Sequence, residues 1–144
     1  MPDLIERAYD INLGSRSGTA VENSQLSGHV LLVVEDEPLV ELDIAEMFTA
    51  SGAHVVSACK IADAILAVDR IKVCVAVLDI DLGGEDCSPV CRHLSERGIP
   101  FLFYTGYPAA PDGWTEVPII SKPAHRSQII DAVERLCRSH QQAA

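Results

Sequence analysis

The sequence predicts an α/β fold in which helices cover both faces of a parallel sheet of five strands. Five short apolar runs alternate with segments of helical periodicity from His29 to near the end of the chain. The first run, Val30–Val34, is continuously apolar, as is typical of strands that are buried on both faces. Successive parallel strands need crossover connections, which are usually helices, so the alternation predicts a doubly wound sheet.

The remaining elements follow from the same alternation. Further strands are expected at residues 54–57, 73–78, 100–104 and 117–121. Helices are expected between Pro38 and Gly52, at residues 61–70 and 89–97, and from Pro123 onward. Residues 106–121 hold three prolines, which favour a loop or a single turn over a regular fourth helix.

The 144 residues are about the length of one domain. Residues 1–28 are rich in Gly, Ser and Asn, and we expect them to form a flexible N-terminal extension. Residues 29–140 then form the folded domain. The hydrophobic content of 48% and the charged content of 22% are globular values, so wholesale disorder is not expected.

Composition also limits the function. The formal net charge of -10 argues against non-specific nucleic-acid binding, which depends on Lys and Arg, and against anionic membrane surfaces. No run approaches the roughly 18 to 20 apolar residues of a membrane span, and the N-terminus lacks the features of a secretory signal, so we expect a cytoplasmic protein. The five cysteines are expected to be reduced thiols that pack as small apolar side chains. The pair Cys87 and Cys91, with His93 nearby, lacks the four ligands of a zinc site.

Reactive side chains follow four of the predicted strands. Glu35 and Asp36 come directly after the first strand, and Asp79, Thr105 and Lys122 come at the ends of later ones. The carboxyl ends of parallel strands lie along one edge of the sheet, where ligands bind. We therefore expect three acids, one hydroxyl and one ammonium to converge there.

These residue types suit a divalent metal and a phosphoryl group. Three crowded carboxylates repel one another unless a cation compensates them, and Mg²⁺ prefers oxygen ligands. Asp79 can then act as a carboxylate nucleophile toward phosphorus, while Lys122 and Thr105 pair with phosphoryl oxygens. Each residue alone has an ordinary explanation, such as a helix cap, a turn or a surface lysine. Their occurrence at successive strand ends favours a common site.

The motifs resemble the receiver domain of two-component response regulators. The matching segments are LLVVEDEPLV, VAVLDIDLGG, YTG and SKP. The resemblance implies a flavodoxin-like receiver fold in which Asp79 is phosphorylated, Thr105 is the switch hydroxyl and Lys122 pairs with the phosphate. It also implies that Asp36 and Asp79 bind Mg²⁺ directly, that Glu35 acts mainly through water, and that the backbone carbonyl of Asp81 is a further ligand. The phosphodonor would be a phosphohistidine on a sensor histidine kinase or a phosphotransfer protein.

A narrower resemblance is to an atypical receiver subgroup whose fourth strand reads Pro-Phe-x-Phe-Ala-Thr-Gly-Tyr. Members often have an irregular fourth helix, and Tyr104 replaces the alanine here. Ile119 stands where ordinary receivers have an aromatic switch residue. Tyr107 either replaces that residue or is an ordinary packed or surface tyrosine. Asp81 replaces a neutral side chain, and we hypothesise that its charge alters the lifetime of the acyl phosphate.

We therefore predict a single-domain response regulator that takes part in a phosphorelay. It would signal through contacts with an unknown downstream protein, and residues 107–114 are the expected mobile element. It would catalyse only its own phosphorylation and dephosphorylation, and both a monomer and a weak homodimer remain open. One alternative is a haloacid-dehalogenase-like phosphatase that uses Asp79 and Asp81. In that family, however, the Asp-x-Asp strand comes first and an acid pair comes late, whereas here the pair precedes it. A second alternative is a binding module that does not accept phosphate, although every expected site residue is present.

Overall fold

The computed structural model describes residues 25–107 and 109–143, with side chains described as far as Ser139. Five parallel strands form one sheet in the order β2-β1-β3-β4-β5. The strands are β1 (Val30–Val34), β2 (His54–Ala58), β3 (Val75–Leu78), β4 (Phe101–Thr105) and β5 (Ile119–Ser121). All five predicted strands are confirmed, with ends that differ from the prediction by at most two residues.

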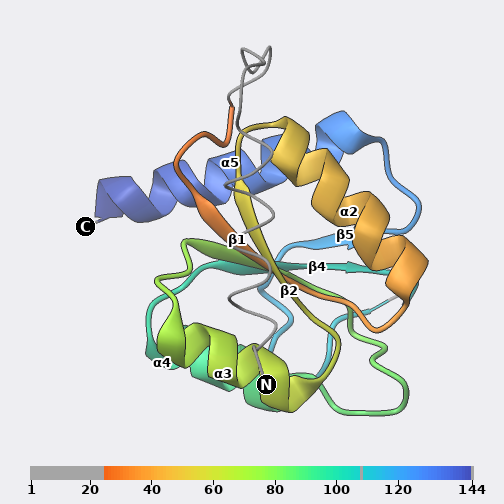
Figure 1. Ribbon diagram of the computed structural model, residues 1–144. Coiled ribbons are helices and arrows are strands. Elements are labelled where there is room, and N and C mark those ends of the chain that lie inside the picture. Colours follow the sequence, from red (N-terminus) through yellow and green to blue (C-terminus); the bar gives the residue numbers. More distant parts are fainter. Residues whose placement is uncertain (1–24, 108, 144) are drawn as a thin grey trace.

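In the described part of the chain, four helices flank the sheet in two pairs (Figure 1). They are α2 (Pro38–Ala50), α3 (Ile61–Arg70), α4 (Ser88–Glu96) and α5 (Arg126–Ala143). Buried residues of α2 and α5 form one apolar core with the sheet, and those of α3 and α4 form the other. The doubly wound sheet predicted from the sequence is therefore confirmed.

The start of α5 differs from the prediction. Pro123 was expected to begin this helix, but the chain bends at residues 122–123 and α5 begins at Arg126. The Lys122–Pro123 peptide bond is cis. The carbonyl of His125 accepts the backbone N–H of Gln128 at 3.0 Å, so His125 provides the first helical hydrogen bond.

The described residues between β4 and β5 contain no helix, which confirms the expected irregular connection. Trp114 and Val117 pack against the core formed with α3 and α4. The ring of Trp114 meets that of Phe101 edge-on, with 5.9 Å between centroids. These side chains cover the part of the sheet where a helix would otherwise pack.

The predicted domain boundary needs a correction. Most of the expected flexible extension, residues 1–24, lies outside the described part of the chain. Leu26, however, is 0% exposed, and its backbone N–H donates to the carbonyl of Ser51 at 2.8 Å. Within the described residues, the packed unit therefore includes Leu26 and does not begin at His29, because this buried leucine is bonded to the residue that follows α2.

Two smaller findings concern the composition. Among the described residues, no helix combines the length and apolarity needed to cross a bilayer. The five cysteines are free thiols; Cys87, Cys91 and Cys137 are buried, Cys74 is half-buried and Cys59 is exposed. The expectation of cysteines packed as small apolar side chains is confirmed for the buried ones and is wrong for Cys59.

Candidate functional site at the carboxyl edge of the sheet

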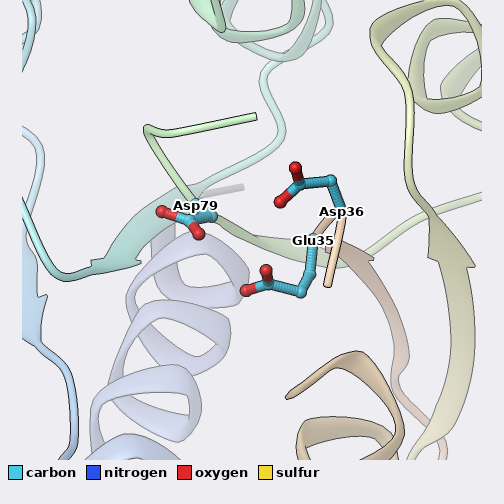
Figure 2. Close-up of side chains that lie close together, drawn as sticks. All are labelled: Glu35, Asp36 and Asp79. Carbon is cyan, nitrogen blue, oxygen red and sulfur yellow. The ribbon is translucent and has the colours of Figure 1, made fainter. Parts of the chain in front are cut away.

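Three carboxylates meet where β1 and β3 end. Glu35, Asp36 and Asp79 each present an oxygen, and these oxygens lie within 4.8 Å of one another (Figure 2). The strands bring them together because β1 and β3 are neighbours, with Val34 paired to Leu78. The convergence of these acids, which the sequence predicted, is confirmed.

The two-residue period of a strand explains which face the site occupies. Val33, Val77 and Ile120 all belong to the core under α2 and α5. Side chains alternate between the faces of a strand, so residues two positions later point the same way. Those residues are Glu35, Asp79 and Lys122, from three different strands.

Lys122 joins the two buried carboxylates. Its Nζ donates to Glu35 Oε1 at 2.5 Å and to Asp79 Oδ2 at 3.0 Å. Its backbone N–H donates to the carbonyl of Thr105 at 2.8 Å, which attaches the end of β5 to the end of β4. The predicted approach of Lys122 to Asp79 is therefore confirmed.

Burial perturbs the ionisation of this pair. Glu35 is 1% exposed, and burial raises the pKa of its carboxyl, although hydrogen bonds from Lys122 and from the Glu37 N–H oppose the change. Burial acts to lower the pKa of Lys122, but hydrogen bonds to Glu35 and Asp79 outweigh it, so the pKa of Lys122 is raised. The site therefore stabilises the charged form of Lys122, whereas burial destabilises the charged form of Glu35. A second cation beside Glu35 would reduce that cost.

The carboxylate of Asp36 lies close to Gly83. Gly83 has φ +66°, in the region that glycine favours, and a Cβ built there would lie 3.2 Å from Asp36 Oδ2. The absence of a side chain at Gly83 leaves the Asp36 carboxylate room at the site.

Asp81 contributes through its backbone rather than through its side chain. Its N–H donates to Asp79 Oδ1 at 3.1 Å, which orients the Asp79 carboxylate. Its own carboxylate is exposed and is not part of the acidic cluster found among the described residues. The role of its carbonyl as a metal ligand stays a prediction.

Thr105 ends β4 and is 0% exposed. Its Oγ1 accepts the backbone N–H of Tyr107 at 3.1 Å. With this acceptor position used, the hydroxyl proton remains available for donation to another group.

A shallow pocket of about 330 Å³ adjoins the site. It lies between the loop after β3 and the segment after β4, and its lining includes Asp81, Cys87 and Tyr107. Tyr107 is 49% exposed, so it is a surface residue here and not part of the packed core. The thiol hydrogen bond with Cys91 lowers the pKa of Cys87 at the base of this region.

Sequence reasoning assigned no role at the site to two residues that shape it, Gly83 and Tyr104. Tyr104 precedes Thr105 on β4, and its ring lies 5.6 Å from Lys122 Nζ. The available signal was the two-residue period: Tyr104 pairs with Ile120, and Lys122 lies two positions beyond Ile120.

Comparison with known proteins supports the fold. No protein-family model matches the sequence, and no curated protein matches it. Among solved structures, the chain is similar to a response regulator receiver protein from Sinorhizobium medicae WSM419, at 25% identity and a TM-score of 0.69, covering 80% of this chain and 98% of that one. It is also similar to a CheY-like receiver domain protein from Methanospirillum hungatei JF-1, at 15% identity and a TM-score of 0.74, covering 81% and 98%.

A third similar structure is the receiver domain of the sensor histidine kinase PA1611 from Pseudomonas aeruginosa PAO1. Its identity is 21% and its TM-score is 0.67, with 78% of this chain and 99% of that one covered. That structure has a magnesium ion coordinated in its active-site cleft. The neighbours are receiver domains, and the five-stranded parallel sheet with its flanking helices is the flavodoxin-like fold that they share.

Proposed function

We propose that this chain is a response regulator receiver that accepts a phosphoryl group on Asp79. The observation that carries the proposal is the contact of one ammonium, Lys122, with both Glu35 and Asp79, beside Asp36 at the carboxyl edge of a receiver-type sheet. Nucleophile, phosphate-pairing cation and acidic ligands are then all within one small site.

The acidic cluster fits a magnesium ion. Its oxygens come from residues that Mg²⁺ prefers, and their mutual distances allow one ion to be shared. Asp36, Asp79 and the carbonyl of Asp81 would bind it directly, and Glu35 would act through water. When bound, the ion would neutralise charge on the incoming phosphoryl oxygens.

Three residues of the chain would carry out the transfer itself. An Asp79 oxygen attacks phosphorus, the P–N bond of a phosphohistidine breaks, and the released imidazole takes up a proton; the product is an acyl phosphate. Lys122 turns from the carboxylates to a phosphoryl oxygen, and the Thr105 hydroxyl donates to another. Phosphoryl transfer needs positioning and charge stabilisation more than covalent help, and these residues supply both.

The phosphodonor would be a sensor histidine kinase or a phosphotransfer protein, and the output would be a contact with a downstream protein. The added charge of about −1.5 to −2 biases a nearby mobile element, for which residues 107–114 are our candidate. The irregular connection after β4 supports membership of the atypical Pro-Phe-x-Phe-Ala-Thr-Gly-Tyr subgroup. The chain would turn over no external substrate beyond its own phosphodonor and acyl phosphate.

The phosphatase alternative is not favoured. It requires the side chain of Asp81 as a second catalytic carboxylate beside Asp79. In this fold that side chain is exposed, and the hydrogen bond from Asp81 to Asp79 comes from its backbone N–H.

The test is incubation with acetyl phosphate and Mg²⁺, followed by intact mass measurement. We expect wild type to gain the mass of one phosphoryl group and Asp79→Asn to gain none. Omission of Mg²⁺ is expected to abolish the gain. Modification of Asp79→Asn to the same extent as wild type, or steady turnover of a generic phosphomonoester, would contradict the proposal.

A further inference from the structure

Tyr104 connects the site to the turn that follows β5. Its ring centroid lies 5.6 Å from Lys122 Nζ, within the range of a cation–π interaction. Its hydroxyl accepts the backbone N–H of Ala124 at 3.2 Å. One side chain therefore contacts both the ammonium and the backbone two residues beyond it.

The position of Tyr104 follows from the strand register. Tyr104 pairs with Ile120, so Lys122 emerges on the same face of the sheet two residues later. Tyr104 is 8% exposed and packs in the core under α2 and α5. The packing of this core therefore holds the ring in position beside Lys122.

The turn between β5 and α5 begins with few backbone N–H donors that could bond to the sheet. The N–H of Lys122 bonds to Thr105, and Pro123 has no N–H to offer. The next donor along the chain is Ala124, and its partner is the Tyr104 hydroxyl. Loss of this hydroxyl would remove the bond that attaches Ala124 to β4, whereas the bond from the Lys122 N–H to Thr105 would remain.

We propose that Tyr104 is a positioning residue that holds the Lys122 ammonium where the phosphoryl group arrives. The inference rests on the proposed function and deepens it, since Tyr104 acts on the transfer through Lys122. A lysine side chain is long and flexible, and a ring beneath its ammonium together with an anchored backbone restricts where it can lie. Because Lys122 stabilises charge that develops during transfer, the effect falls on the rate of transfer more than on donor affinity.

The experiment measures the phosphorylation rate of the full chain over a range of acetyl phosphate concentrations with Mg²⁺. The variants are Tyr104→Phe, Tyr104→Ala, Lys122→Ala and the double variant Tyr104→Ala/Lys122→Ala. Phe103→Leu is the matched control, because Phe103 is a neighbouring buried aromatic residue on the other face of β4.

We expect Tyr104→Ala to lower the maximal rate about tenfold, with the half-saturating donor concentration unchanged. Tyr104→Phe keeps the ring and is expected to lose about two- to threefold. Phe103→Leu is expected to react at the wild-type rate. In the Lys122→Ala background, Tyr104→Ala is expected to have no further effect, since the group that it positions is gone.

The positioning role would be overturned if Tyr104→Ala lowered the phosphorylation rate as much in the Lys122→Ala background as in wild type. It would also be overturned if Phe103→Leu lowered the rate as much as Tyr104→Ala does. If wild type gains no phosphoryl group at all, the proposed function fails, and this inference fails with it. Additive effects in a chain that does become phosphorylated refute only the role of Tyr104. Should Tyr104→Ala fail to fold, Tyr104→Leu in both backgrounds provides the same comparison.

Discussion

Replacement of Lys122 by methionine tests how much the ammonium charge contributes to the stability of the protein. Methionine keeps an unbranched apolar stem and removes the ammonium, so Glu35 and Asp79 lose the cation that contacts both. Glu35 is 1% exposed and Asp79 is 7% exposed, so water can do little to replace the lost cation at either carboxylate. We therefore expect Lys122→Met to destabilise the metal-free protein.

The expected size follows from the burial of the pair. Removal of one partner from a fully buried ion pair costs about 3–5 kcal/mol. The side chain of Lys122 is 21% exposed, so solvent already screens part of the interaction. We expect a loss of about 2–3 kcal/mol in the free energy of unfolding.

Urea unfolding at pH 7 with EDTA measures the loss, and Lys72→Met is the matched control because Lys72 is an exposed lysine. Added Mg²⁺ is expected to restore about 1–2 kcal/mol in Lys122→Met, because an ion that binds only the folded state stabilises it. The urea dependence of the free energy should stay the same in all variants.

The pH dependence of this variant has a definite sign. Burial raises the pKa of Glu35 in the folded protein, so its ionised form opposes folding above the folded-state pKa. As the pH falls through that pKa, Glu35 becomes neutral and needs no cation. The difference between wild type and Lys122→Met should therefore shrink on acidification toward the ordinary glutamate value of 4.5. A Lys122→Met protein as stable as wild type in EDTA at pH 7 would refute the whole line of reasoning.

Three further predictions test individual residues. Leu26→Ala should lower the free energy of unfolding by about 2–5 kcal/mol in urea titrations, because it empties a fully buried position; a loss below 1 kcal/mol would contradict the revised boundary. Gly83→Ala should weaken Mg²⁺ binding about tenfold by calorimetry, because its Cβ would crowd Asp36 from 3.2 Å; unchanged affinity would exclude that role. Asp81→Asn should slow phosphate loss from phosphorylated Asp79 about threefold, since it removes an exposed negative charge that repels the nearby acyl phosphate. An unchanged rate of loss would remove the hypothesis about Asp81.

The strands and the site were predictable from the sequence for one physical reason. A strand buried on both faces must be continuously apolar, so the first polar residue marks its end. In a parallel sheet these ends share an edge, and Glu35, Asp79 and Lys122 could be placed together from sequence alone. Their contacts in the structure confirm that placement.

Features that depend on distant contacts were not predictable. Leu26 is an isolated apolar residue in a polar stretch, and only its contact with the end of α2 shows that it is buried. Pro123 carries the usual signal for a first helical turn, yet the chain bends there and α5 begins at Arg126. The bond from Tyr104 to Ala124 spans 20 positions, and no local pattern predicts it.

The charge of the site suits the proposed use of phosphorylation as a switch. Three carboxylates and one ammonium leave a formal charge of about −2, which a single divalent ion would balance. The phosphoryl group then adds about −1.5 to −2, and Lys122 is the cation already in contact with Asp79. If Lys122 turns to a phosphoryl oxygen as proposed, Glu35 loses its ammonium partner and the contact of Lys122 with the Tyr104 ring changes. Tyr104 also holds the turn at Ala124, which leads into α5, so the proposed role of Lys122 offers a route from the phosphoryl group to a surface helix.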